Sequence, residues 1–304
     1  MKGYRQLLLF VLFPALNTLF AQNSALEVKT LIRDFRGNGS IAIAKNGDIY
    51  VNEYGTANAD ISGTGKHVFV INPEGNSQVL LNTVSGAVGN TLGPDGTYYF
   101  NNGNSIHKSD LMSFKDGELT KIATLEGFSG DILMDKLNTS FYIPSYTLPV
   151  LHKISMDGTV EKYIEDDRLK GVTGITYGEG NTMYLSNFTT GKIFKVEEDK
   201  AIQAFAQIPV TYPGYVIGYI TYFEGFIYAT GYGSNQIYRI NQQGKVYVLA
   251  GSGEYNQNDA TALKAGFITP NGIEIDAKRR RLYITQNGNG RSASLRYIDL
   301  PKEN

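Results

Sequence analysis

A short apolar segment with a tyrosine at its centre recurs along most of the chain, and it constrains the fold more than any other feature. The tyrosines are Tyr50, Tyr99, Tyr142, Tyr184, Tyr228 and Tyr283, at intervals of 49, 43, 42, 44 and 55 residues. Intervals of roughly 40 to 50 residues are typical of propeller blades and similar repeat units, which bury their apolar faces against one another. A repeat that runs through most of the 304 residues predicts one closed domain.

Each repeat has the same internal order of strands and turns. In the first repeat, apolar segments at 39–44, 49–51, 68–71 and 79–81 are separated by turn sequences such as Asn46-Gly47 and Pro73-Glu74-Gly75. Such residues supply the dihedral angles of tight turns between antiparallel strands. Because four antiparallel strands make one blade, we predict an all-β chain that folds as a six-bladed β-propeller.

The two ends of the chain complement each other. The sixth repeat stops at Asp299-Leu300 and lacks a fourth strand, whereas the strand-like stretch 26–35 precedes the first repeat and has no blade of its own. We predict that this N-terminal strand completes the last blade, since closure removes the exposed sheet edges of an open ring.

The first 21 residues have the order of charges and apolar residues found in a secretory signal peptide. Lys2 and Arg5 precede the apolar stretch 7–13, and Ala21 provides a small residue at the exit. The apolar part is short for a membrane span. We therefore predict a signal peptide at 1–21, a single propeller domain at 22–304, a secreted or periplasmic location, and no membrane span after removal of the signal.

Charge and cysteine content limit the partners and the chemistry. The 28 Lys and Arg residues are balanced by 29 Asp and Glu residues, which leaves no basic surface of the kind that nucleic acids need. There are no cysteines, so neither disulfides nor thiolate metal sites are available and the domain must be held by its own core. We expect a monomer that does not bind nucleic acid.

The sixth repeat carries the most specific pattern. Ala250-Gly251, Ala262, Phe267, Pro270-Asn271-Gly272-Ile273 and Leu282-Tyr283-Ile284 resemble an NHL repeat, and the wider pattern is similar to the propellers of the SMP-30, gluconolactonase and LRE-like group. This resemblance implies the six-bladed architecture. It also implies two alternative functions: metal-dependent hydrolysis of lactones or related esters, as in SMP-30-like enzymes, or a protein-interaction platform, as in NHL-like propellers.

The residues that follow each tyrosine strand should converge on one mouth of the central channel. Four places past the tyrosines lie Tyr54, Gly103, Tyr146, Phe188, Tyr232 and Asn287. With the neighbouring amides and one carboxylate they give the predicted binding residues Glu53, Tyr54, Asn102, Tyr146, Asn187, Phe188, Tyr232 and Gln286. Aromatic faces beside neutral hydrogen-bonding groups suit a small polar molecule or a glycan, which is the leading hypothesis. The alternative is that the rings only pack between blades.

A metal site is implied by the resemblance alone. SMP-30-like lactonases hold one divalent cation at the channel mouth, and their motif carries over to Asn271. Other oxygen donors at comparable places are Asn38, Glu53 and Asp131, with Ser129 and Thr173 beside them. Oxygen ligands of this kind suit Ca²⁺ or Mg²⁺. The sequence departs from the family pattern because no glutamate precedes the first inner strand, and Val88, Ile217 and Gln286 stand at other expected ligand positions.

Overall fold

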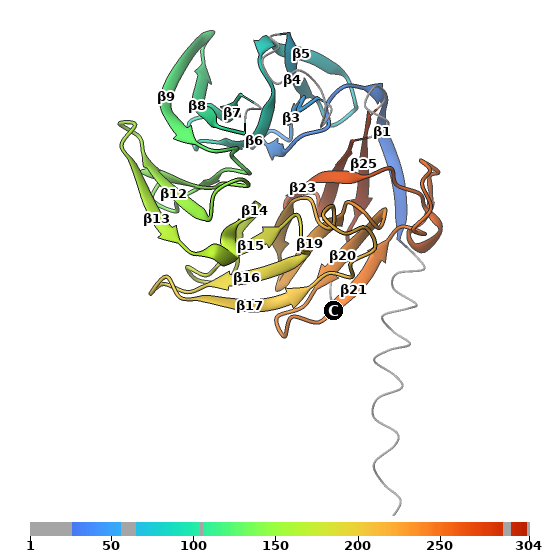
Figure 1. Cartoon of the computed structure of the whole chain (residues 1–304). Helices are drawn as coiled ribbons and strands as arrows, with labels where there is room; N and C mark the ends of the chain where they lie inside the picture. Colours follow the sequence, from blue (N-terminus) through green and yellow to red (C-terminus); the bar gives the residue numbers. More distant parts are fainter. Residues whose placement is uncertain (1–25, 56–64, 104–105, 288–292, 303–304) are drawn as a thin grey trace, which may run out of the picture.

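Six antiparallel sheets, five with four strands and one with five, are arranged around a central axis in the computed structural model (Figure 1). The structure describes residues 26–55, 65–103, 106–287 and 293–302, so the predicted signal peptide lies outside the described residues. The six-bladed all-β architecture predicted from the tyrosine repeat is confirmed. Every one of the six tyrosines lies in the second strand of its blade.

The strands follow one another from the inside of each blade to the outside. Blade 1 comprises β2 (Ile41–Ile43), β3 (Ile49–Asn52), β4 (Lys66–Ile71) and β5 (Ser77–Val84). Blade 2 comprises β6 (Ala87–Leu92), β7 (Tyr98–Asn102), β8 (Lys108–Lys115) and β9 (Glu118–Glu126). Blade 3 comprises β10 (Leu133–Met134), β11 (Ser140–Pro144), β12 (Val150–Ser155) and β13 (Val160–Glu165). Blade 4 comprises β14 (Val172–Tyr177), β15 (Met183–Asn187), β16 (Lys192–Val196) and β17 (Ile202–Gln207). Blade 5 comprises β18 (Ile220–Phe223), β19 (Phe226–Gly231), β20 (Gln236–Ile240) and β21 (Val246–Ala250).

Blade 6 joins the two ends of the chain. Its strands are β23 (Pro270–Asp276), β24 (Arg281–Gln286), β25 (Ala293–Asp299), β1 (Glu27–Phe35) and the two-residue β22 (Ala260–Thr261). The N-terminal β1 pairs with β25 in antiparallel register, as in the pair Val28 and Ile298, and the two lie side by side in Figure 1. The predicted closure is confirmed, and β22 adds a fifth strand outside β1.

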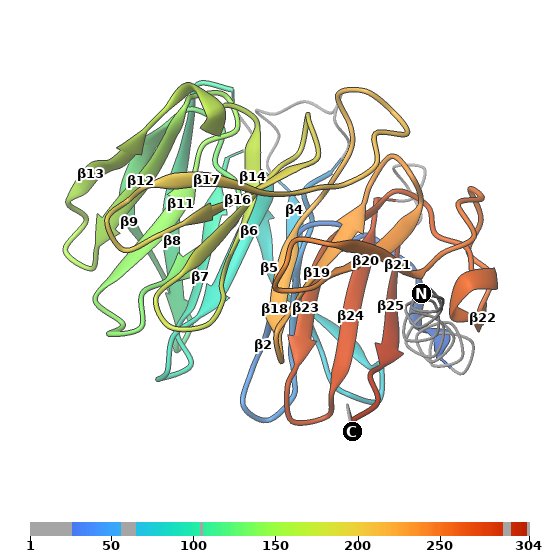
Figure 2. The same cartoon turned by 90° about the horizontal axis from the view of Figure 1, so that it is seen from below.

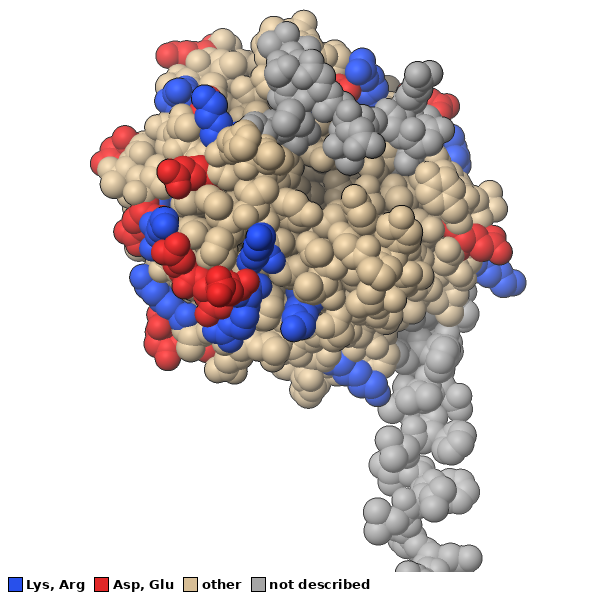
Figure 3. Space-filling view, in the orientation of Figure 1, with Lys and Arg blue, Asp and Glu red and all other residues tan. Residues whose placement is uncertain are grey.

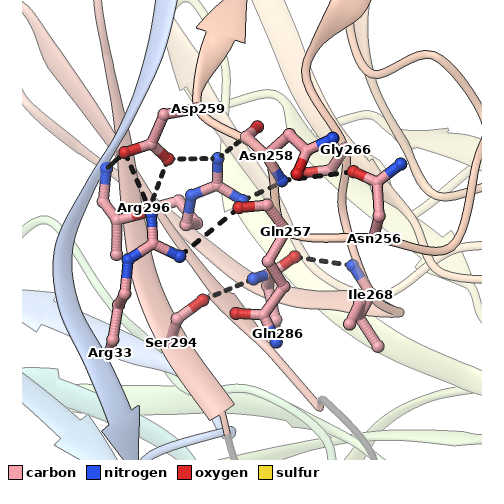
Figure 4. Close-up of polar contacts among 11 residues, drawn as sticks. Arg33, Asn256, Gln257, Asn258, Asp259, Gly266, Ile268, Gln286, Ser294 and Arg296 are labelled. Carbon is pink, nitrogen blue, oxygen red and sulfur yellow. Dashed lines mark hydrogen bonds and ion pairs between the residues drawn. The ribbon is translucent and has the colours of Figure 1, made fainter.

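The stretch 251–269 before the last blade is anchored to this closure (Figure 4). The Arg296 side chain is fully buried, lies 5.3 Å from the Phe267 ring and donates to the Gly266 carbonyl at 2.9 Å. It also donates to the Asp259 carboxylate at 2.8 Å. The same carboxylate accepts from the Thr30 hydroxyl of β1 at 2.6 Å and from Arg33 at 3.2 Å. Asp259 therefore ties the loop to both strands that close the ring, and we call this set of contacts the closure latch.

A glycine near the start of each inner strand lets neighbouring blades approach closely. These glycines are Gly39, Gly89, Gly130, Gly174, Gly218 and Gly272. A Cβ atom on Gly130 would collide with the backbone of Thr173 in the next blade, and one on Gly272 would collide with the backbone of Gly39. Only glycine permits such contact between backbones.

The inner strands alternate between two forms around the ring. In blades 2, 4 and 6 they have 6, 6 and 7 residues and carry a bulge near the glycine. In blades 1, 3 and 5 they have 3, 2 and 4 residues and pair regularly. Since a bulge re-aims the side chains beside it, the two kinds of blade present different residues to the channel. Figure 2 shows the hairpin turns such as the one between β23 and β24 at the bottom of the ring and longer loops at the opposite, mouth face.

Candidate ligand-binding site

A cavity of about 300 Å³ lies at the mouth of the channel. The described residues that line it are Tyr54, Val88, Ile106, Phe128, Tyr146, Thr173, Phe188, Tyr215, Tyr219, Tyr232, Asn271 and Asn287. Figure 3 shows a hollow near the centre of this face with neutral side chains around its visible part, whereas the charged side chains lie mainly toward the periphery. Seven of the twelve residues are aromatic and none is charged.

Five of the rings form a continuous row along the cavity wall. Consecutive centroids are 6.3 Å apart for Tyr54 and Phe128, 6.0 Å for Phe128 and Tyr146, 6.0 Å for Tyr146 and Phe188, and 5.2 Å for Phe188 and Tyr232. Each pair meets edge to face, with interplanar angles between 62° and 83°. Each such contact is worth about 0.5–1.5 kcal/mol beyond simple burial, so the row is a firm wall. We call these five residues the aromatic belt.

Two amides complete the ring around the mouth. Asn287 donates to the Tyr232 hydroxyl at 2.7 Å and accepts from Asn38 Nδ2 at 2.7 Å. The Asn38 carbonyl oxygen Oδ1 in turn accepts from the backbone N–H of Tyr54 at 2.9 Å. Hydrogen bonds from Tyr232 through Asn287 and Asn38 therefore connect the last ring of the belt to the backbone of Tyr54, the first. These bonds hold the two ends of the belt in place before a ligand binds.

The deeper cavity wall carries the polar groups that a ligand could use. Thr173 is 8% exposed, and its hydroxyl has no hydrogen-bond partner within the described chain. Asn271 donates through Nδ2 to the Asn38 backbone carbonyl at 2.8 Å, whereas its Oδ1 makes no hydrogen bond to the described residues. Beside them, burial raises the pKa of the Tyr219 phenol well above its usual value. A buried hydroxyl without a partner is costly, so Thr173 is poised to bond a ligand.

Two carboxyl groups lie in the channel behind this cavity. Asp131 accepts from the Ser40 hydroxyl of blade 1 at 2.8 Å and from the Asn90 backbone N–H of blade 2 at 3.4 Å. Its own N–H donates at 2.7 Å to the backbone carbonyl of the cavity residue Thr173. Burial raises the pKa of Asp131 to about 7, and the nearby Glu274 carboxylate adds to this rise.

Glu274 is the second of these carboxyls. It accepts from the Thr221 hydroxyl of blade 5 at 2.8 Å and from the Ile275 N–H at 2.8 Å. Burial raises its pKa to about 7 as well, because these two hydrogen bonds only partly replace lost hydration. Neither Asp131 nor Glu274 forms an ion pair with a described cationic side chain.

The structure places half of the predicted binding residues in the cavity wall and half inside the fold. The cavity residues are Tyr54, Tyr146, Phe188 and Tyr232. The other four make structural hydrogen bonds: Glu53 accepts from Arg36 at 2.9 Å and His67 at 2.6 Å, Asn102 accepts from the Ser85 N–H at 2.9 Å, Asn187 accepts from the Thr189 N–H at 3.1 Å, and Gln286 accepts from the Ile268 N–H at 2.6 Å.

Three aromatic residues of the cavity wall lie outside the positions predicted from the tyrosine repeat. Phe128, Tyr215 and Tyr219 lie just before or after the opening glycines Gly130 and Gly218 rather than after a tyrosine strand. The signal that could have identified them is an aromatic residue within three places of an opening glycine, as at Gly130 and Gly218.

The residues considered for a metal ion do not gather in one place. Asn38 and Asn271 are hydrogen-bonded to each other, Asp131 is held by Ser40 and Asn90, and Glu53 is engaged by Arg36 and His67. In the described ranges no group of three or more His, Asp or Glu side chains could hold a metal ion. Hard cations usually take several oxygen ligands including carboxylates, so this donor set does not fit Ca²⁺ or Mg²⁺ well.

No protein-family model matches the sequence, and no curated protein matches it either. Solved structures do match. An auxiliary nutrient binding protein from Bacteroides thetaiotaomicron VPI-5482 is 14% identical with a TM-score of 0.72, over 90% of this chain and 76% of that one. A gluconolactonase from Xanthomonas campestris is 14% identical with a TM-score of 0.66, over 93% and 92% of the two chains. This chain shares their six-bladed propeller fold.

A third match has a different activity. Virginiamycin B lyase from Staphylococcus aureus is 16% identical with a TM-score of 0.60, over 91% of this chain and 99% of that one. The resemblance to gluconolactonase-like propellers expected from the sequence thus holds for the fold, which binding proteins, hydrolases and lyases all use. A search of the described part of the propeller for a helix long and apolar enough to cross a membrane found none.

Proposed function

We propose that this protein is a secreted or periplasmic binding protein that takes a small polar molecule, or one unit of a glycan, into the aromatic cavity. The observation that carries the proposal is the cavity itself. It has about 300 Å³ of space, aromatic residues for most of its wall and an unpartnered Thr173 hydroxyl beside Asn271. A preformed, mainly apolar pocket with a few convergent polar groups is the usual form of a small-molecule site.

Three further features support this proposal. The belt is fixed by hydrogen bonds and ring contacts, so little ordering cost remains when a ligand binds. Similar structures include auxiliary nutrient binding proteins from Bacteroides thetaiotaomicron and Bacteroides ovatus. The signal peptide predicted at 1–21 suits a protein that meets its ligand outside the cytoplasm.

The test is a ligand-observed NMR screen of the mature protein against neutral sugars, polyols, lactones and small ammonium compounds. Saturation transfer to a hit should fall strongly in a Tyr146→Ala/Tyr232→Ala variant, and its affinity should drop about tenfold or more, because two ring contacts of about 0.5–1.5 kcal/mol each are lost. Tyr247→Ala on the outer strand β21 is the matched control and should bind as the wild type does. Hits that bind both variants equally would place the ligand outside the belt.

A second candidate function is hydrolysis of lactones or related esters. The observation that favours it is the pair of channel carboxyls, since a carboxyl with a pKa near 7 can act as a general acid or base at neutral pH. The test is lactone turnover with and without added Ca²⁺ or Mg²⁺, together with a thermal-shift titration of the chelator-treated protein. A metal-dependent shift lost in Asn271→Ala would favour this function over simple binding.

A further inference from the structure

The aromatic cavity has an uncharged lining with a carboxyl group directly behind it. None of its twelve described lining residues is charged, yet Asp131 is one hydrogen bond behind the cavity residue Thr173. Tyr219, which also lines the cavity, has its pKa raised mainly by burial and further by the charge of Asp131. The negative charge of the channel therefore reaches the cavity through a single layer of residues.

No positive charge of the described protein balances these carboxyls. Asp131 is faced by Ser40, Asn90 and the Thr173 backbone, with Tyr98, Tyr219 and Glu274 as its titratable neighbours. Glu274 is faced by the Thr221 hydroxyl and its own backbone. Both carboxyls are half-buried, and a carboxylate that is partly removed from water without a counter-charge is costly, while a cavity of low polarity strengthens its field.

The wall of the cavity is also suited to positive charge. Aromatic rings carry negative charge on their faces, and a cation within about 6 Å of a ring centroid is attracted to it. Seven aromatic residues surround a space of about 300 Å³, which is large enough for an alkylated ammonium group with a short polar tail.

The type of cation follows from the mainly apolar wall of the cavity. A primary ammonium gives up three hydrogen bonds to water when it enters, and three acceptors must replace them, whereas most of the described lining residues are aromatic or aliphatic. A quaternary ammonium needs none and gains from ring faces alone. We propose that the ligand of the aromatic cavity carries a quaternary ammonium group, held among the belt rings above Asp131 and Glu274, with a polar tail that bonds Thr173 or Asn271. This inference rests on the proposed binding at the same cavity.

The test compares choline with 3,3-dimethylbutan-1-ol, which has the same shape but a neutral carbon in place of the nitrogen. Both are titrated into the full mature protein by calorimetry at about pH 8, where Asp131 and Glu274 are mostly ionised given their pKa of about 7. An Asp131→Asn/Glu274→Gln variant removes the channel charge without changing shape. A variant with Glu165→Gln and Asp299→Asn is the matched control, because it loses two exposed carboxylates, on β13 and β25, that do not line the cavity.

We expect choline to bind at least tenfold tighter than its neutral counterpart, and this preference to shrink at least threefold in the channel variant but not in the control. Equal affinity of the two compounds would overturn the cation inference while leaving cavity binding in place, as would binding of neutral sugars without binding of choline. An undiminished preference in the channel variant would refute the role of the carboxylates. If no compound of either screen binds, the cavity is not a small-molecule site and both proposals fail.

Discussion

Removal of the Asp259 carboxylate from the closure latch should destabilise the whole propeller, because it leaves a buried guanidinium without its counter-ion. Arg296 is fully buried, and burial lowers its pKa to about 10 against the opposing charge of Asp259. In an Asp259→Asn variant, Arg296 keeps its bonds to the Gly266 and Asn258 carbonyls but loses the charge that offsets its desolvation.

The expected loss of unfolding free energy follows from how deeply Arg296 and Asp259 are buried. Breaking a buried ion pair from one side costs about 3–5 kcal/mol. The Asp259 side chain is 39% exposed and screened by solvent, so we take a value below that range, about 2–3 kcal/mol. For a domain of this size each kcal/mol lowers the melting temperature by about 2–4 °C, so a fall of about 4–12 °C is expected.

Urea unfolding followed by far-ultraviolet circular dichroism measures this effect, and Lys162→Met is the control. Lys162 and Glu165 form an ion pair whose partners are 54% and 57% exposed, so its loss should change stability little. An Arg296→Met/Asp259→Asn double variant should recover part of the loss, since the unpaired charge is gone. If Asp259→Asn unfolds at the same urea concentration as Lys162→Met, the latch does not hold the closure and the reasoning is refuted.

Three other changes test separate parts of the structure. Deleting residues 26–35 removes β1 and exposes the edge of β25, so a large fall in melting temperature is expected, and an unchanged melting curve would contradict closure by β1. Asp131 and Glu274 have raised pKa values of about 7, so between about pH 4 and 7 the native state binds more protons than the unfolded chain, and the free energy of unfolding should decline as pH rises through that window. An Asp131→Asn/Glu274→Gln variant should flatten this decline, and an unaltered profile would show that these two carboxyls do not cause it. His152 is buried without a hydrogen-bond partner in the described chain and burial lowers its pKa, so stability should fall as pH drops below about 6.5, and His152→Leu should remove that loss in melting experiments.

The architecture could be predicted because each blade repeats a local pattern that needs no knowledge of distant residues. Tyr142, for example, follows a glycine-marked inner strand and precedes a hairpin in the same way as Tyr184, and strand order within a blade follows chain order. The closure could be predicted by counting strands, since the sixth repeat lacks a fourth strand and the stretch 26–35 belongs to no repeat.

The binding site could be predicted only in part from the sequence, because hydrogen bonds within loops and contacts between blades orient its side chains, and the pattern of a single repeat does not include these. The residue four places past the tyrosine lines the cavity in all five blades that have a side chain there, and blade 2 has Gly103 instead. Positions two or three past the tyrosines bond within the loops instead, as Asn187 and Gln286 do. The environment of Asp131 depends on Ser40, 91 residues away, so no local pattern could reveal it.

The alternation of long, bulged inner strands with short, regular ones means that the ring has the approximate symmetry of three paired blades rather than six equal ones. The three tyrosines of the belt, Tyr54, Tyr146 and Tyr232, all come from blades with the short form. The wall around the axis is therefore built from three related pairs of blades rather than from six equivalent ones.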